Sequence, residues 1–165
     1  MSKNELMLFY NGTFSQWYKC NFKVEGVQYN CAEQYMMAEK ARLFEDKRAE
    51  EIIMSFSDPR DQKAVGKKVQ NFDLEKWNAV ARDIVYRGNY AKFTQNPSLL
   101  SQLLEAKGYF VEASPTDTIW GVGLSMEGPL ILNEANWRGT NWLGEVLTKV
   151  RDNILNGINH LPKWS

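Results

Sequence analysis

The chain has 165 residues, a length that suits one globular domain with a sizeable hydrophobic core. Its 20 Lys and Arg residues balance 20 Asp and Glu residues, so no global basic field favours nonspecific binding to nucleic acid or membrane. The two cysteines and the single histidine fit no zinc or redox motif. Since neither a signal peptide nor a membrane-spanning stretch is recognisable, we expect a cytoplasmic protein without a membrane partner.

Taken in chain order, the sequence predicts two short strands followed mainly by helices. The second strand region, Phe22–Tyr29, is expected to be a hairpin that turns at Glu25-Gly26. Helices are then expected over 32–44, 47–55, 58–69, 74–93, 96–106 and 141–154, and further short strands over 6–10 and 109–113. The Gly-, Pro- and Asp-rich segment 114–140 is expected to be mostly loop. These elements indicate a mainly α, single-domain protein over residues 1–165.

Two charged residues interrupt the apolar face predicted for the helix over 32–44. At 3.6 residues per turn, Glu33 and Lys40 fall on the same side as Ala32, Met36, Met37, Leu43 and Phe44. The two charged residues lie two turns apart, about 10 Å between Cα atoms, and the Lys40 side chain leans back toward Glu33. A structural ion pair, or two side chains that reach water at the end of the stripe, explains this pattern. A polar pocket with both groups in its wall explains it equally well.

The strand over 109–113, which contains Glu112, and the loop that follows it hold a second set of candidates. Glu112, Asp117 and Trp120 combine carboxylates with an aromatic ring, which suits a sugar or base site, and Gly121 follows directly. The same residues also suit a turn, a core side chain and a turn-forming glycine.

Further candidates lie elsewhere along the chain. Asn141 opens the last helix, where an anion would be favoured, although most such residues only cap. Lys92 lies at the end of the longest helix. It is either a phosphate contact or a basic group that the helix dipole favours there. Trp77 lines a pocket or fills the core. The segment Lys19-Cys20-Asn21-Phe22 has the character of a loop at the edge of a pocket.

Several motifs together resemble the NADAR family, also called YbiA-like, from Phe9 to about Arg151. The motifs are Asn21-Phe22, Ala32-Glu33-Gln34-Tyr35 with Lys40-Ala41, Asp58-Pro59 with Lys63 and Gly66, Lys92-Phe93, Glu112 through Gly121, Trp137-x-Gly-x-Asn141-x-Leu-Gly144 and Arg151. The resemblance implies a multihelical YbiA-like fold with a few short strands. It also implies an N-glycosidase that needs neither metal nor cofactor. Its substrate is then a phosphoribosylamino-pyrimidine intermediate of riboflavin synthesis, or ADP-ribosylated guanine, free or in nucleic acid.

The resemblance favours Glu33, Lys40 and Asp117 as catalytic residues. Either Glu33 or Asp117 activates water for direct displacement, or the Lys40 amine attacks the anomeric carbon and forms an imine. We favour the lysine route slightly. Burial would lower the pKa of Lys40 and Glu33 would raise it, and the sequence leaves open which effect is larger. The expected substrate-binding residues are Asn21, Phe22, Trp77, Lys92, Glu112, Trp120, Gly121 and Asn141.

Two other classes of protein remain open at this point. A non-enzymatic ADP-ribose or nucleotide-binding module would keep Trp120, Asn141 and the cations, but has no use for a Glu–Lys pair. A purely structural protein would place Glu33 and Lys40 at a helix-packing seam. One departure bears on the substrate: Lys19-Cys20 replaces the Phe-Ser pair found in many family members.

Overall fold

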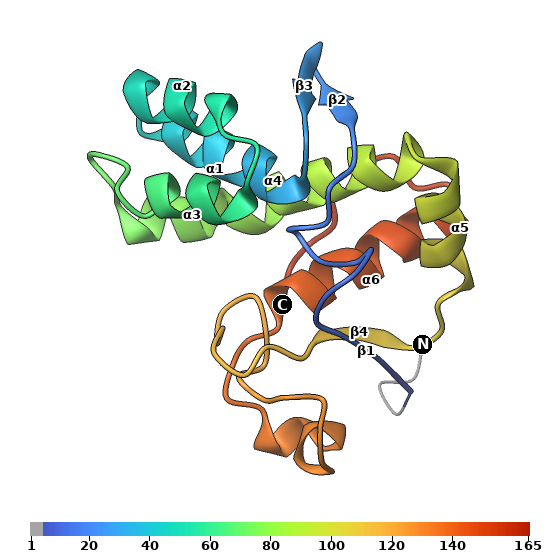
Figure 1. Ribbon diagram of the computed structural model, residues 1–165. Coiled ribbons are helices and arrows are strands. Elements are labelled where there is room, and N and C mark those ends of the chain that lie inside the picture. Colours follow the sequence, from blue (N-terminus) through green and yellow to red (C-terminus); the bar gives the residue numbers. More distant parts are fainter. Residues whose placement is uncertain (1–4) are drawn as a thin grey trace. The chain divides into compact units, whose positions relative to one another are not determined.

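A computed structural model describes residues 5–165, and helices dominate it (Figure 1). The strands are β1 (Leu6–Phe9), β2 (Phe22–Val24), β3 (Val27–Tyr29) and β4 (Tyr109–Glu112). The helices are α1 (Ala32–Leu43), α2 (Lys47–Ser55), α3 (Pro59–Gly66), α4 (Leu74–Thr94), α5 (Pro97–Glu105) and α6 (Trp142–Leu155). Two 3-10 turns, η1 (Leu130–Leu132) and η2 (Glu134–Asn136), interrupt the loop before α6. The predicted fold class, mainly α with a few short strands, is confirmed.

The chain divides into two compact units. Gln16–Pro97 forms one, called here the helical unit, and Ser98–Ser165 together with the segment ending at Ser15 forms the other, called here the mixed unit. The first four residues, part of the segment on which the absence of a signal peptide was predicted, lie outside the described residues. None of the helices within residues 5–165 is long and apolar enough to cross a membrane.

Helix α1 is the centre of the helical unit, and α2, α3 and α4 pack against it. Cys31 caps its N-terminus, and the Cys31 Sγ accepts a hydrogen bond from the Gln34 backbone N–H. Two glycines permit the close packing. A Cβ at Gly66 of α3 would lie 2.0 Å from Met37 Sδ, and one at Gly88 of α4 would lie 2.7 Å from the Tyr35 ring. Only the absence of a side chain allows these helices to approach so closely.

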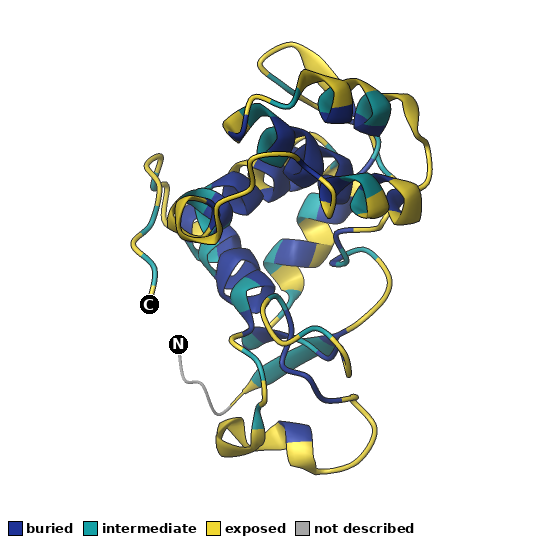
Figure 2. Ribbon diagram, turned by 90° about the vertical axis from the view of Figure 1, so that its left-hand side faces the viewer, coloured by how far each residue is buried: buried dark blue, intermediate teal, exposed yellow. Residues whose placement is uncertain are grey.

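The two-faced pattern predicted for α1 is wrong in one respect. Residues 32–38 are all buried, including Gln34, Tyr35 and Ala38, which the helical spacing places on the side opposite the predicted apolar face. Figure 2 shows this helix buried along most of its length. The assignment failed because α1 has neighbours on several sides, so that one stripe no longer describes what is buried.

The mixed unit is built on a parallel pair of strands. β1 pairs with β4 in the register Leu6↔Tyr109 to Phe9↔Glu112, and α6 packs against β4. The end of β4 leads into a small core formed by Val111, Ala113, Val122, Leu124 and Ile131. The segment 114–140 is mostly loop, as predicted. Apart from Ile131, its two 3-10 turns carry no buried residue (Figure 2).

Candidate functional site

The helical unit holds the Glu33 and Lys40 pair on α1. Glu33, in the first turn, is only 6% exposed, and its backbone N–H donates to the Gln16 carbonyl at 2.9 Å. Lys40, in the last turn, is half-buried. Burial lowers the pKa of Lys40 below its ordinary value, and the charge of Glu33 opposes this with a smaller effect. The question that the sequence left open is therefore answered in favour of burial.

Two aromatic rings lie close to the Lys40 amine. Its Nζ lies 4.6 Å from the centre of the Phe72 ring and 5.7 Å from the centre of the Trp77 ring. Trp77, a predicted site residue in the first turns of α4, is buried, whereas Phe72 is 43% exposed. We call Glu33, Lys40, Phe72 and Trp77 the Lys40 cluster. Phe72 was missed by the sequence analysis because it lies between helices, where no periodicity marks it.

A second group of predicted residues lies around Lys92, also in the helical unit. The Lys92 side chain is fully buried, and burial lowers its pKa to about 8. Its Nζ lies 4.9 Å from the Phe93 ring centre and 5.7 Å from that of Tyr18. The opposing electrostatic effect on Lys92 comes first from Cys20, so the departure from the family pattern lies close to this amine.

Asn96, which the sequence analysis missed, joins this group to the predicted Asn21. Its side-chain amide donates to the Asn21 carbonyl at 3.0 Å and to the Lys92 carbonyl at 2.8 Å. The Asn21 residue is exposed, while Phe22 is buried and stacks on Tyr29 with 5.8 Å between ring centres. Phe22 therefore anchors the hairpin, and Asn21 is the member of the pair that is open to solvent.

Glu112, Asp117, Trp120, Gly121 and Asn141 all belong to the mixed unit. Asp117 is half-buried, and its Oδ1 accepts hydrogen bonds from the backbone N–H groups of Ile119 (2.9 Å) and Trp120 (2.8 Å). These bonds form the turn that orients the Trp120 ring, which meets Trp142 edge-on at 5.6 Å. A Cβ at Gly121 would lie 3.0 Å from the Asp117 carbonyl, so glycine keeps this turn tight.

Asn141 connects β4 to the start of α6 through both ends of its side chain. Its Oδ1 accepts from the Glu112 N–H at 3.0 Å, and its Nδ2 donates to the Phe110 carbonyl at 2.9 Å. Its backbone is left-handed, with φ 53°, and its side chain makes no capping bond to α6. Asn141 thus organises the backbone around Glu112. Its predicted contact with substrate stays a prediction.

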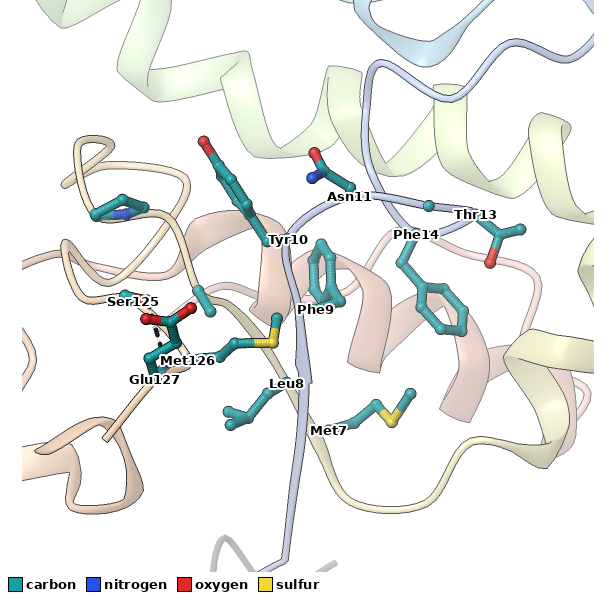
Figure 3. Close-up of a pocket in the computed structure, with 13 residues that line it drawn as sticks. Met7, Leu8, Phe9, Tyr10, Asn11, Thr13, Phe14, Ser125, Met126 and Glu127 are labelled. Carbon is teal, nitrogen blue, oxygen red and sulfur yellow. Dashed lines mark hydrogen bonds between the residues drawn. The ribbon is translucent and has the colours of Figure 1, made fainter. Parts of the chain in front are cut away.

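Two cavities belong to the mixed unit. One of about 670 Å³ lies beside the end of β1 and the Ser125–Glu127 segment, and none of the predicted site residues lines it (Figure 3). The other, of about 340 Å³, is lined by Asn141 together with aromatic and acidic side chains, among them Trp137, Trp142 and Glu145. No group of three or more potential metal ligands occurs within residues 5–165.

The chain has the mainly helical architecture of a YbiA-like protein. The solution structure of Escherichia coli YbiA matches with a TM-score of 0.76 and 25% identity, over 98% of this chain and 92% of that one. The NADAR domain model matches residues 8–155, and the chain belongs to the NADAR family.

Two relatives add functional names. N-glycosidase R617 of Acanthamoeba polyphaga mimivirus is 45% identical over 145 residues, covering 84% of this chain and 85% of the relative. The chloroplastic riboflavin biosynthesis protein PYRR of Zea mays is 30% identical over 131 residues, which are 74% of this chain but 19% of the maize protein. The resemblance predicted from the motifs is therefore confirmed at the level of the family.

Proposed function

We propose that this protein hydrolyses the N-glycosidic bond between a base and a phosphorylated ribose, with the Lys40 amine as nucleophile. The predicted class of enzyme, a hydrolase of N-glycosyl bonds, is confirmed by the NADAR family match and by the relative named N-glycosidase at 45% identity. The substrate and the roles of the residues are our proposal. The observation that carries it is the lowered pKa of a lysine that lies close to two aromatic rings and shares its helix with a buried carboxylate.

The chemistry follows from the state of the amine. An uncharged Lys40 amine attacks the anomeric carbon, and the base leaves with the electron pair of the broken bond and one proton of the ammonium group that forms. The second proton of that group moves to the ring oxygen as the ring opens. Opening of the sugar ring gives an imine, which water hydrolyses to the free sugar and the original amine. Positive charge builds on the sugar during attack, and the Glu33 carboxylate stabilises it. A lowered pKa favours this route because more of the amine is uncharged near neutral pH.

The competing route uses Glu33 or Asp117 to activate water, without a covalent intermediate. Only the lysine route makes use of an amine whose pKa is lowered by burial, and this observation favours the lysine route. A module that only binds ADP-ribose would have no use for such an amine either. The role of Asp117, in the other unit, stays a prediction from the family motif.

Trapping of the imine tests the mechanism. Borohydride reduces an imine to a stable amine, so substrate and borohydride together should leave one ribose phosphate unit on the peptide that contains Lys40. Intact-mass and peptide-mass measurements read this out. Lys40→Arg, which keeps a positive charge, is the matched control and should give no adduct. Turnover without any adduct on Lys40 would overturn the lysine route, whereas solvent oxygen at the anomeric carbon is expected from both routes.

Two substrates separate the remaining alternatives. We propose ADP-ribosylated guanosine and a phosphoribosylamino-pyrimidine as candidates, the second supported by the maize relative's name. Release of free base from one of them identifies the leaving group. Binding of ADP-ribose without release of base from either substrate would instead support the binding module. The expected cytoplasmic location stays a prediction.

A further inference from the structure

Phe72 is held in place by the short loop between α3 and α4. The Gln70 backbone N–H donates to Asp46 Oδ2 at 2.9 Å, which ties the loop to the start of α2. Asn71 has a left-handed backbone with φ 63°, a conformation that asparagine tolerates better than most residues. Asp73 then caps α4 by accepting from the Lys76 N–H at 3.1 Å. Because the residues on either side of Phe72 are held by these interactions, the Phe72 backbone is held in place as well.

The Phe72 ring covers the last turn of α1 and leaves much of its own surface in solvent. The Phe72 ring packs against Phe44 with 5.3 Å between ring centres. The Lys40 Nζ lies 4.6 Å from the centre of the Phe72 ring. Phe44 is buried, but Phe72 is 43% exposed. A large apolar ring that stays so exposed contributes little to the core. Its role is therefore sought in the groups that it covers.

We propose that Phe72 is a positioning residue that shields the Lys40 amine from water and holds it ready to attack the sugar. This inference rests on the proposed function, because it assigns a purpose to the shielding. The groups that face the amine from α4 and the preceding loop are the uncharged rings of Trp77 and Phe72. Glu33, on α1 itself, is the charged group whose effect on Lys40 is resolved.

Removal of the ring should therefore change the amine in a definite direction. Water would reach Lys40, the cost of carrying a charge there would fall, and its pKa would rise toward the ordinary value. Loss of the attraction between ring and protonated amine acts in the opposite direction. The sign of the measured change thus decides whether Phe72 acts by excluding water.

Competitive acetylation of the full chain measures this without any substrate. Trace acetic anhydride from pH 6 to 11, followed by peptide mass spectrometry, gives the pKa and reactivity of Lys40 against the other lysines. In Phe72→Ala the pKa of Lys40 should rise and its reactivity near pH 7.5 should fall by about 3- to 10-fold, since tenfold corresponds to one pKa unit. Phe72→Leu, still apolar, should retain most of the effect.

The matched control is Phe56→Ala, which removes another exposed phenylalanine of the helical unit. It should leave Lys40 unchanged. If Phe72→Ala does not fold, Phe72→Gln applies the same test with a polar side chain of moderate size. An unchanged or lowered Lys40 pKa in the folded variant would overturn the inference. If the pKa moves but the pH dependence of turnover does not follow it, the shielding is supported and the nucleophilic role of Lys40 is the part that fails.

Discussion

Two lysines of the helical unit are buried to different degrees, and this difference gives them different chemistry. Lys40 is partly open and lies beside aromatic rings and a carboxylate, whereas Lys92 is enclosed completely. The pKa values of both amines are lowered by burial. Only Lys40 combines a lowered pKa with access for a substrate, so the two residues should respond differently to substitution.

The first prediction concerns Lys40→Ala, which should abolish turnover while changing the free energy of unfolding by less than about 1 kcal/mol. A lysine that is half of a structural ion pair would instead leave Glu33 buried alone, at a cost of about 3–5 kcal/mol. Urea unfolding combined with a product assay measures both quantities. A folded Lys40→Ala variant with normal turnover would exclude the catalytic role.

Lys92 gives a prediction about stability and pH. Its pKa is lowered from 10.5 to about 8, so between these values the unfolded chain binds more protons than the folded one. The free energy of unfolding therefore rises with pH between about 8 and 10.5. Below this window Lys92 is protonated in both states, and its contribution no longer changes with pH. At about 1.4 kcal/mol per pKa unit, the whole effect is on the order of 3 kcal/mol.

Lys92→Met removes this charge and should flatten the rise. We expect urea unfolding to give the variant a higher free energy of unfolding than the natural chain at pH 7. This difference should shrink as the pH rises to 10.5. Lys63→Met, an exchange at a less buried lysine of α3, is the control and should run parallel to the natural chain. A constant difference between Lys92→Met and the natural chain at all pH values would contradict the assignment.

The sequence singles out Glu33 and Lys40 as candidates, but it does not reveal which aromatic rings lie near Lys40 or Lys92. Lys92 was read as a residue at a helix end, because its position in the chain gives no sign of the Tyr18 ring near its amine. Phe72 was not singled out for the same reason. A residue's own type and spacing are visible in a sequence, while contacts made across a fold are not.

At the scale of elements, local signals placed most boundaries well. Asp58-Pro59 begins α3 with Asp58 as cap, and the hairpin turns at Glu25-Gly26, where both residues have positive φ. α2 matches its predicted range, while α3 ends at Gly66 rather than near Val69. These features depend on neighbours in the chain, which is why sequence patterns can reveal them.

Asn141 provides the third prediction, at the junction of β4 and α6. Asn141→Gly loses both side-chain bonds to the β4 backbone and should cost about 2–4 kcal/mol of the free energy of unfolding. Asn141→Ala loses the same bonds and adds strain from its positive φ, so it should be less stable than the glycine variant by about 1 kcal/mol. Equal stabilities of the two variants in urea would argue against strain at this position.

At the scale of the whole molecule, the mixed unit is discontinuous in the sequence. Leu6 pairs with Tyr109, so one strand of the mixed unit precedes the helical unit in the sequence and the other follows it. The sequence predicted both strands but could not reveal their parallel pairing, because no local pattern connects segments so far apart. The NADAR match over residues 8–155 includes parts of both units.

This arrangement leads to a prediction about local opening. Phe110 is fully buried, and its ring meets those of Phe9 (6.2 Å) and Phe14 (5.0 Å). Phe110→Leu should destabilise the mixed unit by about 1–2 kcal/mol. Amide hydrogen exchange should then accelerate in residues 6–9 together with 109–112 and α6, because strands that share a ladder open together.

Ile53→Val makes a comparable change in the core of the helical unit and should cost about 0.5–1.5 kcal/mol. Amide exchange measured by mass spectrometry on both variants shows whether β1 opens together with the mixed unit or together with the helical unit. If β1 belongs to the mixed unit, residues 6–9 respond to Phe110→Leu more strongly than to Ile53→Val. The reverse order would mean that β1 opens with the residues that follow it in the chain, and that its pairing with β4 contributes little to its stability.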